Sequence, residues 1–195
     1  KFCRHRGPEV MPTGQTHQAQ HTNFPGVGLV TSGPGGTNTI TAVSAAWIDS
    51  TPCLFISGQA KRSDLMGDTG VRQMGSQEVD IVSIVRPITK YAAMILDPGD
   101  IRFHLEKAWY EATTGRMGPV WIDIPANIQN AKINPKKLIN YKPRIQTKKN
   151  SILDNKIKKI AKLFLKYNRP MFHIGHGVKI SKGQKYLRKI VDKYK

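Results

Sequence analysis

Two short apolar runs, at residues 27–30 and 53–57, most constrain what this 195-residue chain can fold into. Neither run alternates polar with apolar residues, which is typical of strands that are buried on both faces of a parallel sheet. A glycine-rich turn at 31–38 and a segment at 38–48 with apolar residues at helical spacing lie between them. The order strand, helix, strand predicts a βαβ unit.

Further elements extend this unit into an alternating α/β domain over residues 1–130. They are a helix at 80–85, a strand at 89–95, a helix at 101–113 that Gly115 ends, and a strand at 119–125. The polar stretch 60–75 is expected to be a long loop of the kind that carries function. Residues 1–26 follow neither the strand nor the helix period and are predicted to be irregular. The fold class is therefore α/β: a parallel sheet with helices on both faces.

The last third of the chain is predicted to hold a linker and the start of a second α/β domain. Residues 131–150 contain prolines and lysines without periodicity, as interdomain linkers do. Within 151–195, apolar residues predict helices around 157–165 and 186–191, with a strand at 170–175 between them. We expect the chain to stop inside this second domain.

The net charge of +18 raises the question of a nucleic-acid partner. Residues 1–130 hold 11 Lys+Arg and 11 Asp+Glu, so the excess comes entirely from residues 131–195, with 20 basic residues against 2 acidic ones. These lysines are scattered through a linker and around helices, without the interleaved aromatic residues of a nucleic-acid-binding surface. Nucleic-acid binding is thus an alternative that the pattern disfavours.

Cysteine usage and hydropathy exclude two other classes of protein. Cys3 and Cys53 are too few for a disulfide framework and lie in no metal-ligand spacing, so both are predicted to be plain thiols, and no metal site is expected. The sequence contains no apolar run long enough for a membrane span, and its first residues lack the apolar stretch of a signal peptide. A cytoplasmic protein without a membrane partner is expected.

The glycine-rich turn by itself allows two interpretations. Backbone N–H groups after a strand and before a helix could bind an anion, and a tight turn that simply needs glycine would look the same. Further segments add specificity because they occur in a characteristic order. They are residues 31–38, 47–52, 57–59, 77–82, 86–90 and 114–125.

Together these segments resemble the pyrimidine-binding domain of thiamine-diphosphate enzymes of the acetolactate synthase type. Residues 168–178 are similar to the start of that family's central domain. The resemblance also implies that the sheet is N-terminally incomplete, without its first strand and helix. The resemblance implies thiamine diphosphate as cofactor, with the glycine turn near its pyrimidine end and with Gln77 beside its reactive centre as a catalytic residue. The turn residues concerned are Ser32, Gly33, Pro34, Gly35 and Asn38. By itself, Gln77 could equally be an ordinary amide on a surface loop.

The same resemblance implies the rest of the enzyme. Diphosphate and Mg²⁺ are held in this family by a separate C-terminal domain, and the sites lie between subunits, so a homodimer or homotetramer is expected. Ser50 and Arg116 match positions that contact FAD, although Arg116 could equally cap a helix end. The activity implied is that of a carboligase or decarboxylase acting on pyruvate or a similar 2-oxo acid, as in branched-chain amino acid biosynthesis.

The sequence departs from the family pattern at two places. Family members place a catalytic glutamate after a histidine, but Arg6 follows His5 here and the nearest carboxylate is Glu9. A local frameshift in the coding sequence and a divergent, inactive relative are both open explanations. Ala126 stands where acetolactate synthases usually carry an entrance lysine, which indicates another 2-oxo acid donor.

Overall fold

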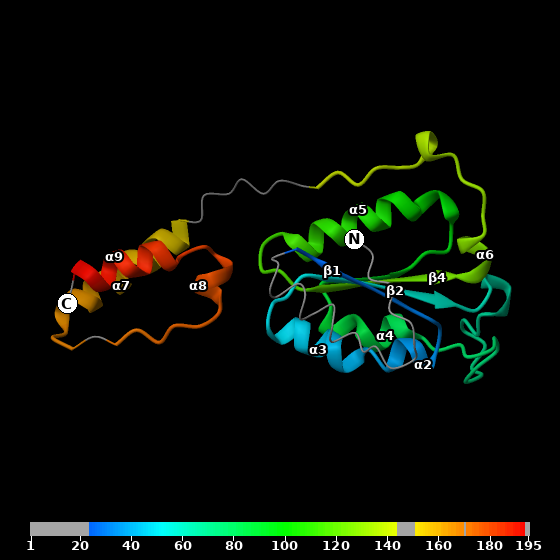
Figure 1. The fold of residues 1–195 in the computed structure, drawn as a ribbon, viewed down its shortest axis with the longest axis horizontal. Helices are drawn as coiled ribbons and strands as arrows, with labels where there is room; N and C mark the ends of the chain where they lie inside the picture. The colour runs from blue at the N-terminus through cyan, green and yellow to red at the C-terminus, as the bar shows by residue number, and fades with distance from the viewer. Residues whose placement is uncertain (1–23, 144–150, 170, 194–195) are drawn as a thin grey trace. The chain divides into compact units, whose positions relative to one another are not determined.

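The computed structural model describes residues 24–143, 151–169 and 171–193, and the chain forms two compact units, 1–143 and 144–195. The first unit is built on a four-stranded sheet in the order β1-β2-β4-β3, in which every pairing is parallel (Figure 1). Its strands are β1 (Gly26–Val30), β2 (Cys53–Gln59), β3 (Tyr91–Met94) and β4 (Pro119–Pro125). The predicted α/β fold with a parallel sheet is therefore confirmed.

Helices cover both faces of this sheet. On one face lie α3 (Ile40–Ile48) and α4 (Ile81–Val85), and on the other lies α5 (Ile101–Thr113), as Figure 1 shows. Two shorter helices, α2 (Pro34–Thr37) and α6 (Ala126–Gln129), follow β1 and β4. Short 3₁₀ turns complete the unit at Arg62–Asp64, Arg86–Ile88, Pro98–Asp100 and Pro135–Lys137.

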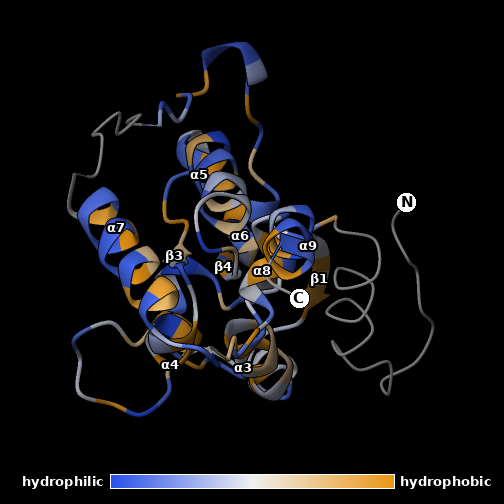
Figure 2. Cartoon of the chain, turned by 90° about the vertical axis from the view of Figure 1, so that its left-hand side faces the viewer, coloured by the Kyte–Doolittle hydropathy of each residue, from blue (hydrophilic) through white to orange (hydrophobic). Residues whose placement is uncertain are grey.

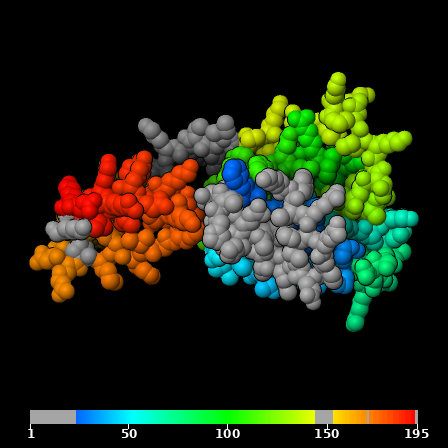
Figure 3. All heavy atoms as spheres, viewed as in Figure 1, coloured from blue at the N-terminus to red at the C-terminus, as the bar shows by residue number. Residues whose placement is uncertain are grey.

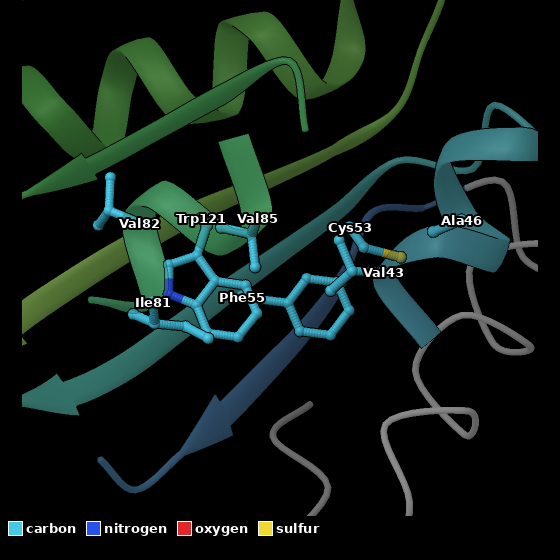
Figure 4. Packing of buried hydrophobic residues seen from close by; sticks show 8 residues of the cluster. All are labelled: Val43, Ala46, Cys53, Phe55, Ile81, Val82, Val85 and Trp121. Carbon is cyan, nitrogen blue, oxygen red and sulfur yellow. The ribbon is translucent and has the colours of Figure 1, made fainter. Parts of the chain in front are cut away.

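Two covered faces explain the unbroken apolar run of β2, whereas β1 differs from the prediction because Val27 and Leu29 are exposed on one face of this edge strand. Alternate residues of β2 point to opposite sides, so Phe55 packs with α3 and α4, whereas Leu54 packs with α5. On the first face the rings of Phe55 and Trp121 are fully buried and stack with their centroids 5.5 Å apart (Figure 4). Burying an aromatic side chain of this size contributes about 2–3 kcal/mol, so this pair is a major part of the core.

Helix α5 begins and ends as predicted, and a lysine from a distant motif explains its end. Gly115 has a φ of 62° one residue past the C-cap, where a left-handed residue commonly ends a helix. The Lys90 ammonium donates to the carbonyl oxygens of Glu111 and Thr114, the latter at 2.7 Å. A Cβ at Gly118 would lie 3.3 Å from the Lys90 stem, so this glycine makes room for the lysine.

Two boundaries differ from the prediction. The turn at 31–38 contains a helical turn of its own, α2, because Pro34 starts it with a φ already suited to a helix. Strand β2 extends beyond the predicted run 53–57 through Gly58 and Gln59, because both residues pair with β4. The loop at 60–75 is irregular apart from its 3₁₀ turn, as expected.

The described part of the second unit is helical. It contains α7 (Ser151–Lys166), α8 (Gly177–Ile180) and α9 (Gln184–Lys193), and Figure 2 shows apolar and polar residues interspersed along α7. The strand predicted at 170–175 is wrong for residues 171–175, which are irregular. A strand needs a hydrogen-bonded neighbour, and the described residues of this unit contain no second strand to supply one.

Candidate functional site

The carboxyl ends of β1, β2 and β4 meet at one edge of the sheet. They border an open pocket of about 520 Å³. In open α/β sheets, ligands bind in the crevice outside the carboxyl ends of the strands. The lining residues are uncharged: Leu29, Val30, Thr31, Ser32, Ile56, Ser57, Gly58, Gln59, Ile124, Ala126 and Gln129. The pocket therefore suits a neutral ligand group with hydrogen-bond donors and acceptors.

Two of the predicted cofactor residues come together beside this pocket. Gly33 has a φ of 55°, and a Cβ at this position would lie only 2.4 Å from the backbone oxygen of Gln77. Glycine is thus required both for the left-handed backbone and for the close approach of the second chain segment. Gln77 is itself left-handed, with a φ of 56°, and its side chain is exposed.

The remaining predicted turn residues differ in their exposure. Ser32 is half-buried and lines the pocket, and Gly35 is half-buried against Thr31. Pro34 at the start of α2 and Asn38 at its C-cap are exposed. Gly36 would place a Cβ 3.2 Å from Ile81, so α2 packs closely on the core. The packing alone requires glycines here, which favours the tight-turn interpretation over an anion site.

A buried polar network joins β2 and β4 near their carboxyl ends. The carboxylate of Asp123 is fully buried and accepts hydrogen bonds from the Ser57 hydroxyl at 2.5 Å and the Gln59 amide at 2.9 Å. The Trp121 indole N–H donates to the Ser57 oxygen at 2.8 Å. Burial raises the pKa of Asp123 to about 6, against the lowering effect of the two donors and with a further raising effect of Asp80. The side chains of Ser57 and Gln59 are buried on the same side of the sheet as Phe55 and Trp121, so one buried acid organises the ends of β2 and β4 beneath that face.

A second buried acid organises the loop that carries Gln77. Glu78 accepts backbone N–H bonds from Met66 at 2.6 Å, Met74 at 3.0 Å and Gly75 at 3.1 Å. Burial acts to raise the pKa of Glu78, but the three backbone donors outweigh it and lower the pKa below its usual value. The loop projects from the surface in Figure 3, yet it is fastened internally by this carboxylate.

Ser50 and Arg116 also come together, but at the opposite end of the sheet. Arg116 Nε donates to Ser50 Oγ at 2.8 Å, and Ser50 is buried with a φ of 57°. Both residues lie just before the first residues of strands β2 and β4, whose other ends form the pocket. A strand of this length spans roughly 20 Å, so within this chain the pair is distant from the pocket.

Glu9 lies outside the described residues, as does Cys3. Cys53 is a free, buried thiol, as predicted, and burial raises its pKa to about 12. The described residues include no cluster of three or more His, Cys, Asp or Glu side chains that could bind a metal. Within the part of the chain that the structure describes, no helix is both long and apolar enough to span a membrane.

Asp123, Ser57, Gln59 and Glu78 are the residues that sequence reasoning did not assign to the site. All four lie within the quoted motifs, and Asp123 is a charged residue inside an otherwise apolar strand, which was the available signal. Their partners lie far away along the chain, so the signal could not show what they bind.

Comparison with known proteins bears on the family of this site. Residues 16–84 match the model of the thiamine pyrophosphate enzyme N-terminal TPP binding domain. The chain is 38% identical over 168 residues to the acetolactate synthase large subunit of Corynebacterium glutamicum, covering 84% of this chain and 25% of the relative. These matches support an acetolactate synthase-like thiamine pyrophosphate enzyme.

Two other relatives support the same placement. The acetolactate synthase large subunit of Buchnera aphidicola is 37% identical over 182 residues, which cover 90% of this chain and 30% of the relative. Chloroplastic acetolactate synthase 2 of Nicotiana tabacum is 34% identical over 179 residues, which cover 89% of this chain and 25% of the relative. The chain thus spans a quarter to a third of the length of these acetolactate synthases.

Proposed function

We propose that this chain is the pyrimidine-binding part of a thiamine-diphosphate-dependent carboligase or decarboxylase that acts on pyruvate or a similar 2-oxo acid. The observation that carries the proposal is the approach of Gln77 to Gly33 beside the pocket at the carboxyl end of the sheet. The relatives are acetolactate synthases, which supports this reaction class.

The residues present fit one end of the cofactor. Neutral hydroxyl and amide groups line the pocket, and an aminopyrimidine ring is a neutral group that hydrogen-bonds through such partners. The lining contains no cation and the described residues no metal cluster, so we assign the diphosphate and Mg²⁺ to residues outside this pocket. Bound thiamine diphosphate would supply a carbanion-stabilising centre, and this chain would orient it and position Gln77.

Three finer parts of the proposal rest on family resemblance. A homodimer or homotetramer would complete the site, and FAD would contact the Ser50–Arg116 pair. We further propose a cytoplasmic location, although the name of the tobacco relative places that protein in the chloroplast. The test is the flavin absorption band at about 450 nm in the purified proteins. Loss of this band in Ser50→Ala, but not in wild type, would support the FAD contact.

The alternative is a relative that binds the cofactor without turnover, which is favoured by Arg6 at the position where family members carry glutamate. Sequencing the coding DNA through codons 1–25 distinguishes the two: a one-base correction that restores glutamate after His5 supports the enzyme. Confirmation of Arg6 supports the inactive relative. Formation of acetolactate from pyruvate by the gene product is the direct assay.

Binding is tested by calorimetric titration of the chain with thiamine diphosphate, with thiamine and with pyrophosphate in separate runs. Competition is then tested by titrating thiamine diphosphate in the presence of each of the other two compounds. We expect thiamine to compete with thiamine diphosphate because both carry the aminopyrimidine, and pyrophosphate not to compete. Competition by pyrophosphate alone, or the absence of binding by all three compounds, would refute the proposed role of the pocket.

A further inference from the structure

We propose that Gln59 is a latch that ties both ends of the 60–79 segment to the buried Asp123 carboxylate and thereby positions Gln77 against Gly33. In this view Gln59 and Asp123 are positioning residues. The latch itself is a property of the free chain, and only its effect on ligand binding rests on the proposed function.

The latch consists of three hydrogen bonds made by one side-chain amide. The side-chain oxygen of Gln59, Oε1, accepts from the backbone N–H of Ala60 at 2.9 Å, at the start of the segment. The Gln59 Nε2 donates to the backbone oxygen of Val79 at 2.9 Å, at its end, and also to Asp123 at 2.9 Å. A single buried side chain therefore closes a loop of about twenty residues, which is long for an irregular connection.

The anchor of the latch is the central sheet. Gln59 is the last residue of β2 and is paired with β4, and Asp123 lies within β4 itself. The Ser57 hydroxyl and the Trp121 indole complete the network, so the Asp123 carboxylate has a donor on each oxygen. Because both anchor strands are buried and hydrogen-bonded on both sides, the position of Val79 is fixed relative to the pocket.

The latch is close enough to Gln77 to determine its position. Val79 lies two residues after Gln77, and Glu78 between them is buried. Glu78 fastens the residues before Gln77 to one another, but the three backbone N–H groups that donate to it all lie within the loop. Gln59 joins the end of this stretch to the sheet, whereas the start of the segment is also held by the Arg62 N–H, which donates to Asn127 Oδ1. We expect the close approach of Gln77 to Gly33 to depend on the Gln59 attachment.

The test measures amide hydrogen exchange of the 195-residue chain without any ligand. Gln59→Met keeps the length of the side chain and removes all three bonds. We expect exchange of the amides in 60–79 to rise by about tenfold or more, while β1 and β4 keep their protection. Gln129→Met is the matched control, because Gln129 Nε2 donates to Ile124 and not to the loop.

A double variant separates the latch from a general role in stability. In Gln59→Glu with Asp123→Asn, the new amide can donate to the new carboxylate, so the pair at the sheet is restored, but the Val79 carbonyl still lacks a donor. We expect the sheet to keep its protection while the loop stays loose. Wild-type protection of the loop in the double variant, unchanged loop exchange in Gln59→Met, or failure of both variants to fold would refute the latch.

Calorimetry with thiamine diphosphate then tests positioning. We expect Gln59→Met to bind about tenfold more weakly than wild type. Equal affinity in the two proteins, with the loop loosened, would refute the positioning of Gln77. If wild type does not bind at all, the proposed function fails, and the exchange experiment still decides whether the latch exists.

Discussion

Gly33 and Gln77, which lie 44 positions apart in the sequence, approach so closely that a Cβ on the glycine would stand 2.4 Å from the glutamine's backbone oxygen. The contact joins the turn after β1 to the end of the long loop. Five predictions test this contact, the two buried acids and the end of α5.

Gly33→Ala should destabilise the chain by about 2–4 kcal/mol, because the left-handed backbone and the collision with Gln77 both act against the new methyl group. Gly115→Ala is the matched control: Gly115 has a φ of 62° but nothing within 4 Å of its Cβ. It should cost only about 1 kcal/mol. Urea unfolding measures both, and equal midpoints for the two variants would contradict the close approach.

Asp123 should make the chain more stable as pH falls from 8 toward 5. Its pKa is raised from 3.8 to about 6 in the folded chain, so the folded state binds this proton more tightly than the unfolded state does. The contribution is complete below the unfolded pKa and is lost as pH rises through about 6, with a ceiling of about 3 kcal/mol.

Urea unfolding between pH 5 and 8 tests this dependence, with Asp123→Asn as the comparison. The difference in unfolding free energy between the two proteins should change across this range, because the variant cannot titrate at this position. A constant difference would contradict the raised pKa of Asp123.

Glu78→Gln should loosen the loop, because the neutral amide accepts three backbone N–H bonds less well than the carboxylate and adds donors of its own. We expect a cost of about 1–3 kcal/mol and faster proteolytic cleavage within 65–75. Asp68→Asn, at an exposed site in the same loop, is the control and should be cleaved like wild type.

Glu78 should also affect stability in acid with the opposite sign to Asp123. Its pKa is lowered from 4.5 in the folded chain. Its contribution is therefore present above the unfolded value and is lost as pH falls through the lower folded value. Wild type should lose stability relative to Glu78→Gln below about pH 4, and parallel unfolding curves there would contradict this role.

Lys90→Met should cost about 1–2 kcal/mol, because the carbonyl oxygens of Glu111 and Thr114 lose a charged donor while the apolar stem is kept. The loss should appear first as faster amide exchange in the last turn of α5. Lys132→Met changes an exposed lysine and should leave both stability and exchange near wild type. Equal effects of the two variants would exclude a capping role for Lys90.

The parts of the fold that were predicted from sequence are those that local patterns specify. Helix α5 has a clear apolar period and a glycine just past its end, and both of its limits agree with the structure. The unbroken apolar run of β2 requires two covered faces, and this requirement predicts a parallel sheet. The strand prediction was wrong for residues 171–175 because strand formation also depends on a partner elsewhere in the chain.

By itself, the sequence determined the succession of elements, the place of the excess charge and the order of motifs that marks the acetolactate synthase-like family. Only the tertiary structure decided which groups meet: Gln77 with Gly33, Ser50 with Arg116, and Gln59 with both Val79 and Asp123. The physical reason is range. Periodicity and propensity act over a few residues, whereas hydrogen bonds and close packing depend on positions that only the folded sheet brings together.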